Sequence, residues 1–468
     1  MRRLLIGLIH ALLFAAIAFG SAAEAQIGAG RAPGFRAGLR TFSIAAEAPS
    51  QLRVVTTQNR MNIGAETRNV TDSWVRCPIV IAADSSEIVL SWANWYNLGS
   101  GAGEFAGANA VTLLGVALER SANASSTVVA TAPVTFSGGR TVTVPADAND
   151  FQSDPLPASA FGLPKFSSGE WYWIKVRQQV PSASGTIPYS DRAVVSASGS
   201  QSAWFDPAVT TASSVDTLGA FTSTGTAPGS RANYWCPVVL GRPLVDGPSE
   251  GGVGDSIMTI TADNGANTTP VHGVGWFQRT RHDAGTAVTG LRPGILAGRV
   301  GAATTHFVGS NTRWRAWIKY ARTWVVGLGT NDIGTSSSGT VPATTLTNLA
   351  DIYMAIKAVP GTKVGAAKTI PRTSSTDTWA TVANQTPFPG WGAGDKAAQL
   401  NDWIDARFAD GTLSFKIDMT SVRDPTEPLK WRVTGAANGT TSDGTHPVAV
   451  TMEDMAVEGR AAFAAVPQ

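Results

Sequence analysis

The feature that most constrains the fold is a change of hydrophobic pattern near residue 236. From about residue 26 to 235, short apolar or alternating runs are separated by Gly, Ser, Asn, Asp and Pro. Alternation with a period of two is typical of strands, and regularly spaced turns favour a β-sandwich of jelly-roll type. We therefore expect an all-β sandwich domain over 26–235, without helices. The predicted strands are 88–92, 110–118, 140–144 and 171–176.

After about residue 236, strand-like and helix-like segments alternate. We predict strands at 324–328, 363–368 and 414–417, and helices at about 346–356, 400–408 and 448–465. Such alternation indicates an α/β domain over 236–468, built on a parallel sheet covered on both faces. In these folds ligands bind beyond the carboxyl ends of the strands, so catalytic residues are expected in the loops that follow them.

The first 25 residues have the pattern of a secretory signal. Two arginines precede an apolar run from Leu4 to Phe19, and small residues end at Ala25. We expect cleavage before Gln26 and a secreted or periplasmic protein. A retained membrane anchor is the alternative, but the apolar run is short for a bilayer span. No cysteine lies near the cleavage point, which disfavours a lipid anchor.

The charge balance excludes several classes of partner. The formal net charge is +2. The signal contributes +1 of this, from Arg2, Arg3 and Glu24, which leaves +1 for the mature chain. A nearly neutral chain has no basic surface suited to nucleic acid or to an anionic membrane. We expect neither as a partner, and the sequence carries no signal for an oligomeric state.

Cys77 and Cys236 are the only cysteines, and each is followed by proline and an apolar run. In an oxidising compartment they could form one disulfide. Two buried free thiols are the equal alternative, because a sequence does not show whether two Cβ atoms come close. Both readings stay open at this point.

Four short motifs after residue 250 carry side chains or backbone groups suited to catalysis. They are Gly-Asp-Ser at 254–256, Gly-Arg-Val-Gly at 298–301, Gly-Thr-Asn-Asp at 329–332 and Asp-Gly-Thr-His at 443–446. Each alone is a common turn sequence. Together, in this order and near predicted strand ends, they favour a catalytic site.

The chemistry of these motifs is mutually consistent. A serine hydroxyl such as that of Ser256 becomes a useful nucleophile when an imidazole held by a carboxylate removes its proton. Asp443 and His446 can supply that pair from one loop. The tetrahedral intermediate needs hydrogen-bond donors, which the Ser256 N–H, a glycine N–H and the Asn331 amide can provide.

The order and local motifs of Ser256, the glycine, Asn331 and His446 resemble those of the SGNH, or GDSL-like, hydrolases. The resemblance covers about residues 236–468. It implies a flavodoxin-like three-layer α/β/α sandwich, no cofactor, and hydrolysis of carboxylic esters through an acyl-enzyme. The oxyanion glycine is assigned to Gly301, with Gly298 as the alternative. Residues 142–176 also resemble the β-sandwich segment of some secreted GDSL esterases.

One segment departs from the family pattern. The strand before Gly-Asp-Ser is normally a continuous apolar run, whereas here a glycine-rich stretch at 247–252 separates Val238–Leu240 from Val253. We therefore expect the first strand of the sheet to be short or displaced.

Other candidate site residues favour structural roles. His272, His282 and His306 lack metal-ligand spacing and no HExxH pattern accompanies them, so no metal site is expected. A group of aromatic residues could form a sugar-stacking platform, but such residues more often fill a sandwich core. They are Trp92, Trp95, Tyr96, Trp171 and Trp173.

The sequence thus predicts a secreted serine ester hydrolase that acts on a small-molecule or polysaccharide ester. Export together with a β domain favours acetyl or other short acyl groups on a carbohydrate. A lipase or arylesterase is one alternative. A non-catalytic polysaccharide-binding surface protein with a relict hydrolase fold is another, although the intact serine, asparagine, aspartate and histidine argue against it.

Overall fold

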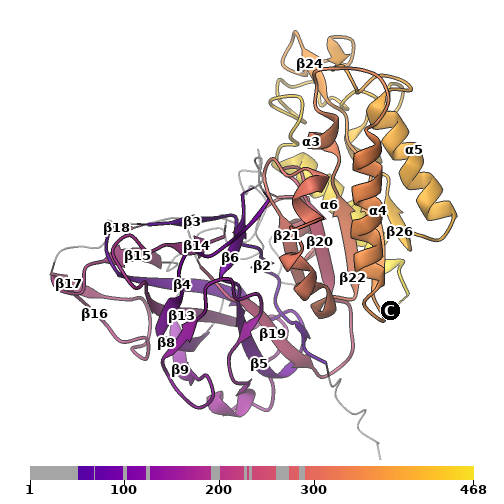
Figure 1. Cartoon of the computed structure of the whole chain (residues 1–468). Helices are drawn as coiled ribbons and strands as arrows, with labels where there is room; N and C mark the ends of the chain where they lie inside the picture. The colour runs from indigo at the N-terminus through magenta and orange to yellow at the C-terminus, as the bar shows by residue number, and fades with distance from the viewer. Residues whose placement is uncertain are drawn as a thin grey trace, which may run out of the picture. The chain divides into compact units, whose positions relative to one another are not determined.

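The computed structural model describes residues 51–67, 69–98, 103–122, 127–190, 201–225, 229–230, 235–259, 274–283 and 290–467 (Figure 1). The expected signal at 1–25 lies outside these residues. The described residues belong to one compact unit. No helix among them is both long and apolar enough to cross a membrane.

Two antiparallel sheets dominate the first half of the described chain. The larger has the order β10 (Val142–Val144), β8 (Val111–Ser121), β13 (Trp171–Gln179), β4 (Asp72–Val80), β15 (Gln201–Phe205) and β18 (Gly229–Ser230), with β9 (Val128–Val134) also on β8. The smaller has the order β1 (Arg53–Val54), β19 (Val238–Pro243), β5 (Ser85–Trp92) and β11 (Phe151–Gln152), with β12 (Leu156–Pro157) also on β5. All four strands predicted for this half are confirmed.

Short pairs of strands complete this half of the chain. They are β3 (Gly64–Glu66) with β14 (Ile187–Tyr189), β6 (Trp95–Asn97) with β7 (Glu104–Ala106), and β16 (Thr210–Ala212) with β17 (Ser223–Gly225). Helical structure in its described part is limited to the 3-10 turn η1 (Ala158–Phe161).

Alternating side chains of β5 explain how the two sheets pack. Ile88, Leu90 and Trp92 join one buried cluster with Cys77 and Ile79 of β4 in the larger sheet. Of the aromatic residues expected in the core, Tyr96 is only half-buried and stacks on Phe105, whereas the four tryptophans are buried: Trp92, Trp95, Trp171 and Trp173. The structure also decides between the two cysteine alternatives, because Cys77 and Cys236 form a disulfide.

The second half is built on a parallel sheet. Its order is β2 (Asn59–Arg60), β21 (Gly294–Gly298), β20 (Glu250–Gly254), β22 (Thr323–Gly327), β23 (Lys363–Ala367) and β26 (Phe415–Ile417). The five strands from the second half follow the order 2-1-3-4-5 of flavodoxin-like doubly wound sheets. The three strands predicted in this half are confirmed as β22, β23 and β26.

Helices pack on both faces of this sheet (Figure 1). Trp324 and Val326 of β22 join a buried cluster with α4 (Ala343–Lys357) and α5 (Lys396–Ala409). Val325, between them, faces the opposite cluster with α2 (Trp276–Arg279) and α6 (Ala449–Ala464). The three predicted helices are confirmed as α4, α5 and α6. The remaining elements are η2 (Thr304–Phe307), η3 (Arg313–Tyr320), α3 (Thr330–Ile333), the pair β24 (Thr373–Ser375) and β25 (Gln385–Pro387), and η4 (Thr420–Val422).

The end of the glycine-rich stretch, at 250–252, begins the central strand β20, so of the two expected alternatives, short or displaced, the structure shows the short strand. The strand is short, as expected, and pairs with β21 and β22. Its glycines leave room for neighbouring aromatic rings, since a Cβ at Gly251 would lie 2.2 Å from the ring of Trp324. A Cβ at Gly252 would lie 2.9 Å from the ring of Phe277. Aromatic side chains of neighbouring elements therefore fill the space that side chains of β20 would otherwise occupy.

Two short strands cross the expected boundary at residues 235 and 236. The apolar run Val238–Leu240 belongs to β19, which pairs with β5 of the smaller antiparallel sheet. In the other direction, β2 pairs with β21 of the parallel sheet. Whether residues 26–235 and 236–468 are separate domains stays a prediction.

Candidate active site

Three neighbouring parallel strands bring the first three motifs to one edge of the sheet. In the register of β21, β20 and β22, Gly254 lies opposite both Gly298 and Gly327. Ser256 follows β20 by two residues, Gly301 follows β21 by three, and Asn331 follows β22 by four. All three therefore lie just beyond the carboxyl ends of adjacent strands, Ser256 and Gly301 in turns and Asn331 in α3, where doubly wound folds place their sites.

Ser256 lies in a tight turn directly after β20. The Asp255 side chain closes this turn, because its Oδ1 accepts the N–H of Ile257 at 2.9 Å. The Asp255 carbonyl accepts the N–H of Thr259 at 3.2 Å. Ser256 is only 4% exposed. A local turn therefore fixes its backbone immediately after a central strand.

His446 connects Ser256 to Asp443. The Ser256 hydroxyl donates to Nε2 of His446 over 2.9 Å. On the other side of the ring, Nδ1 donates to Oδ2 of Asp443 over 2.6 Å. The His446 side chain is 18% exposed and that of Asp443 is 47% exposed. This hydroxyl–imidazole–carboxylate arrangement is the one that activates a serine for nucleophilic attack.

The loop that carries His446 is closed by its own hydrogen bonds. Oδ1 of Asp443 accepts the backbone N–H of Thr445 at 2.8 Å and that of His446 at 2.7 Å. The Thr441 hydroxyl donates to the His446 carbonyl at 2.8 Å. Gly444 has φ +74°, and a Cβ there would lie 1.8 Å from the Thr373 carbonyl oxygen. Glycine is therefore required at this position.

The charge of Asp443 is stabilised by the same loop. Partial burial alone would raise the pKa of its carboxyl group. Hydrogen bonds from the His446 side chain and from the backbone of His446 and Thr445 outweigh that effect, so the pKa lies below its usual range. Asp443 is thus an anion that can stabilise a protonated His446.

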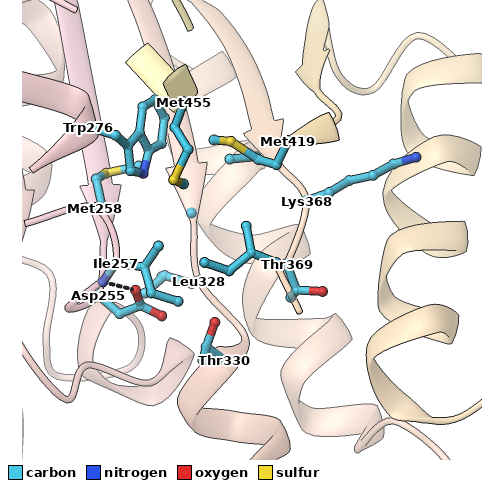
Figure 2. Close-up of a pocket in the computed structure, with 13 residues that line it drawn as sticks. Asp255, Ile257, Met258, Trp276, Leu328, Thr330, Lys368, Thr369, Met419 and Met455 are labelled. Atoms are coloured by element: carbon cyan, nitrogen blue, oxygen red, sulfur yellow. Dashed lines mark hydrogen bonds between the residues drawn. The ribbon is translucent and has the colours of Figure 1, made fainter. Parts of the chain in front are cut away.

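Asp255 has the opposite electrostatic character. It is buried, and burial raises the pKa of its carboxyl group to about 7. The N–H of Ile257, the charge of His446 and the Thr330 side chain partly oppose this shift. Asp255 and Thr330 line a cavity of about 20 Å³ together with Met258, Trp276 and Thr369 (Figure 2). This volume is enough for one water molecule.

The Asn331 side chain contacts the backbone beside one candidate oxyanion glycine. The Asn331 amide donates to the Ala302 carbonyl at 2.9 Å, next to Gly301. Gly301 is exposed and has φ +77°, a left-handed conformation that suits glycine. Gly298, the alternative, is the last residue of β21 and is buried. The two segments are therefore joined at the edge where Ser256 lies.

Two polar residues at this edge were not identified from the sequence. Asp332 accepts the N–H and the hydroxyl of Thr304, at 3.0 Å and 2.5 Å. The Arg372 guanidinium donates to the hydroxyl of Thr445 at 3.1 Å. Asp332 lies within the Gly-Thr-Asn-Asp motif, so its position was a signal. Arg372 belongs to no motif, and only the fold brings it here.

The remaining histidines have structural partners. His282 is buried, and its Nδ1 contacts the Asp283 carbonyl at 2.6 Å. His306 accepts the N–H of Ala303 through Nδ1 at 3.1 Å. His272 lies outside the described residues. Within the described part of the chain, no three His, Cys, Asp or Glu side chains are grouped as a metal site would require.

No protein-family model matches the sequence, and no curated protein sequence matches it. Solved structures that are similar to this chain at low identity include ester hydrolases. A GDSL-like lipase from Bacteroides thetaiotaomicron is 16% identical with a TM-score of 0.29, over 46% of this chain and 87% of that one. An acetylxylan esterase from Geobacillus stearothermophilus is 12% identical with a TM-score of 0.31, over 46% and 94%.

A longer match is a carbohydrate esterase family 2 enzyme with its carbohydrate-binding domain, from Corynascus thermopiles (Myceliophthora fergusii). It is 15% identical with a TM-score of 0.30, over 89% of this chain and 99% of that one. Similarities at these sequence identities and TM-scores do not indicate a function. The function is therefore inferred from the side chains of the site.

Proposed function

We propose that the chain is a serine ester hydrolase of the SGNH type, with Ser256 as nucleophile, His446 as general base and Asp443 as the residue that orients the imidazole. The observation that carries the proposal is the continuous contact from Ser256 Oγ to His446 Nε2 and from His446 Nδ1 to Asp443 Oδ2. The depressed pKa of Asp443 supports it, because a persistent anion favours the imidazolium formed during attack.

The reaction has two halves. Ser256 Oγ attacks the ester carbonyl carbon while His446 takes the hydroxyl proton. His446 then returns this proton to the departing alcohol, which leaves an acyl group on Ser256. In the second half, water attacks the acyl-enzyme and gives its proton to His446. Release of the carboxylic acid regenerates the Ser256 hydroxyl.

The negative charge on the intermediate requires donors, which we assign to the N–H groups of Ser256 and Gly301 and to the Asn331 amide. An amide group has two N–H bonds. Only one is used in the contact between Asn331 and the Ala302 carbonyl. The other is the one we assign to the oxyanion.

The finer features of the proposal concern architecture and substrate. We propose a three-layer SGNH-type domain and a jelly-roll-like sandwich, in a protein exported after cleavage before Gln26. As substrate we propose acetyl or other short acyl groups on a carbohydrate. The signal-like N-terminus and the large β-rich region support this choice over a lipid or aryl ester.

The test is ester hydrolysis by the exported protein beside its Ser256→Ala variant. The substrates are p-nitrophenyl acetate, p-nitrophenyl octanoate, phenyl acetate with ethyl acetate as its alkyl counterpart, and acetylated xylo-oligosaccharides, compared by kcat/KM. We expect Ser256-dependent release of acetate from the oligosaccharides, and N-terminal sequencing to begin at Gln26. A preference for octanoate would favour a lipase. Equal rates from the wild type and the variant would contradict the proposal and favour a non-catalytic protein with a relict hydrolase fold.

A further inference from the structure

The segment from Arg299 to His306 follows β21 and carries Gly301, the proposed oxyanion glycine. One side of this segment is held by the turn after β22. Asn331 donates to the Ala302 carbonyl at 2.9 Å, and Asp332 accepts the N–H and the hydroxyl of Thr304. These contacts come from the same sheet as the nucleophile.

The other side of the segment is held by β6, which belongs to the β-rich half of the chain. Nδ2 of Asn97 donates to the His306 carbonyl at 3.0 Å. In return, the guanidinium of Arg299 donates to the backbone carbonyl of Asn97. The Arg299 N–H also donates to the Gly254 carbonyl at 3.0 Å, two residues before Ser256. Asn97 is completely buried. The Asn97 side chain thus holds the segment at His306, the end opposite to Arg299.

The β6–β7 hairpin is itself fixed to the second half of the chain. The Glu104 carboxylate accepts the N–H groups of Arg313 at 2.7 Å and Trp314 at 3.1 Å, at the start of η3. Trp95 packs on Trp317, with ring centroids 5.4 Å apart.

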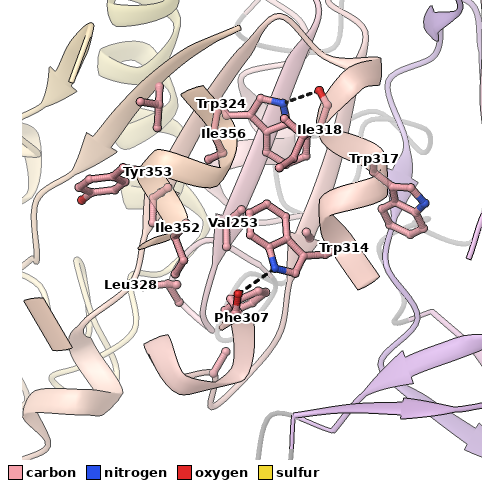
Figure 3. Close-up of a cluster of buried hydrophobic side chains, with 14 of the residues drawn as sticks. Val253, Phe307, Trp314, Trp317, Ile318, Trp324, Leu328, Ile352, Tyr353 and Ile356 are labelled. Carbon is pink, nitrogen blue, oxygen red and sulfur yellow. Dashed lines mark hydrogen bonds between the residues drawn. The ribbon is translucent and has the colours of Figure 1, made fainter. Parts of the chain in front are cut away.

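η3 in turn contacts the segment that carries Gly301. The Trp314 indole donates to the Phe307 carbonyl at 3.0 Å, directly after His306 (Figure 3). The hairpin therefore reaches the Gly301 segment by two routes, one through Asn97 and one through Glu104 and η3.

We propose that the β6–β7 hairpin is part of the catalytic machinery and that Asn97 is a positioning residue for the oxyanion donors. This inference rests on the proposed hydrolase function. Oxyanion donors act only when they are held at hydrogen-bond distance from the developing charge, and a displacement of about 1 Å can cost ~100-fold in rate. The β-rich half would then affect kcat by holding the oxyanion donors in place, in addition to any contact it makes with substrate.

The experiment compares Asn97→Ala with Asn94→Ala. Asn94 is a matched control, because it is equally buried and its Nδ2 donates to the carbonyls of Asn109 and Pro145 at 2.9 Å each. Both of these partners lie in the β-rich half. We expect both variants to lose thermal stability. We expect kcat on p-nitrophenyl acetate to fall about tenfold or more only in Asn97→Ala, with KM little changed.

A second readout is the rate at which a fluorophosphonate labels Ser256, since that reaction also develops charge on an oxygen in the oxyanion site. It should fall in parallel with kcat. If Asn97→Ala does not fold, Asn97→Leu fills a similar volume, removes the donor to the His306 carbonyl, and should show the same loss. Equal kcat values for the Asn94 and Asn97 variants, in an enzyme that still depends on Ser256, would overturn the inference. An enzyme unaffected by Ser256→Ala would instead overturn the proposed function.

Discussion

The two sides of the candidate site are built in different ways. The base side is one loop, in which Asp443, Thr445 and His446 hold each other through local hydrogen bonds. The oxyanion side joins the end of β21, the turn at α3 and strand β6, which are far apart in sequence. The base side therefore depends on a short motif, whereas the oxyanion side depends on how distant segments fold together. The following predictions test this difference.

The largest effect is expected from removal of the base. His446→Ala leaves Ser256 without a proton acceptor, and kcat should fall by roughly 10⁴-fold or more. Initial rates of p-nitrophenyl acetate hydrolysis measure this. An unchanged thermal midpoint is the control for folding, and a loss below tenfold would contradict the assignment of the base.

A smaller loss is expected when only the orienting charge is removed. Asp443→Asn keeps the size of the side chain but removes the anion that stabilises the imidazolium, so kcat should fall by roughly 10⁴-fold, less than on loss of the imidazole itself. The double variant Asp443→Asn with His446→Ala should be no slower than His446→Ala alone, because the two residues act as one unit. Additive losses would show that they act separately.

Loss of one oxyanion donor should cost less again. Asn331→Ala removes the proposed donor and the contact with Ala302, and we expect kcat to fall by about 10²- to 10³-fold. KM should change little, because the lost bond strengthens only in the transition state. A rise in KM at constant kcat would instead assign Asn331 to substrate binding.

Asp255 should affect turnover least and stability most visibly. Its pKa in the folded protein is raised to about 7, whereas an unfolded carboxyl titrates near ~3.9. The folded state therefore holds an extra proton between these values, and stability falls as pH rises from about 4 to about 7. Asp255→Asn removes this fall, so its thermal midpoint relative to wild type should be higher at pH 8 than at pH 5.

Asp377→Asn is the matched control for that measurement. Hydrogen bonds from Thr381, Asn384 and Ser375 hold the pKa of Asp377 below its usual range. Its carboxylate therefore stays charged from pH 5 to 8 in both the folded and the unfolded state. The midpoint difference for this variant should not change with pH, and a change as large as that for Asp255 would contradict the explanation by burial.

Much of the fold follows from patterns that are local in sequence. The apolar period of α4 and the buried run of β22 predict their elements because burial of one face selects those side chains. β20 has no such apolar pattern, because the aromatic rings of Trp324 and Phe277 occupy the volume that its own side chains would have filled. A glycine-rich strand is recognisable only once its neighbours are known.

The same division holds for the site. The Asp-Gly-Thr-His motif predicts the hydrogen bond between Asp443 and His446 because three residues span one turn. Arg372 and Asn97 carry no local signal, and their roles arise from contacts with Thr445 and His306 across the fold. Sequence patterns therefore indicated the candidate catalytic groups but not Arg372 and Asn97, which contact their loops.

Each half of the chain contributes one strand to a sheet of the other half: β2 pairs with β21, and β19 pairs with β5. A shortened chain starting near residue 236 would keep β19 without β1 and β5, and would leave the edge of β21 without β2. Each half divided at residue 236 would therefore lack strands that pair with it in the whole chain. A graft or fusion would have to move the two together, with both crossing strands.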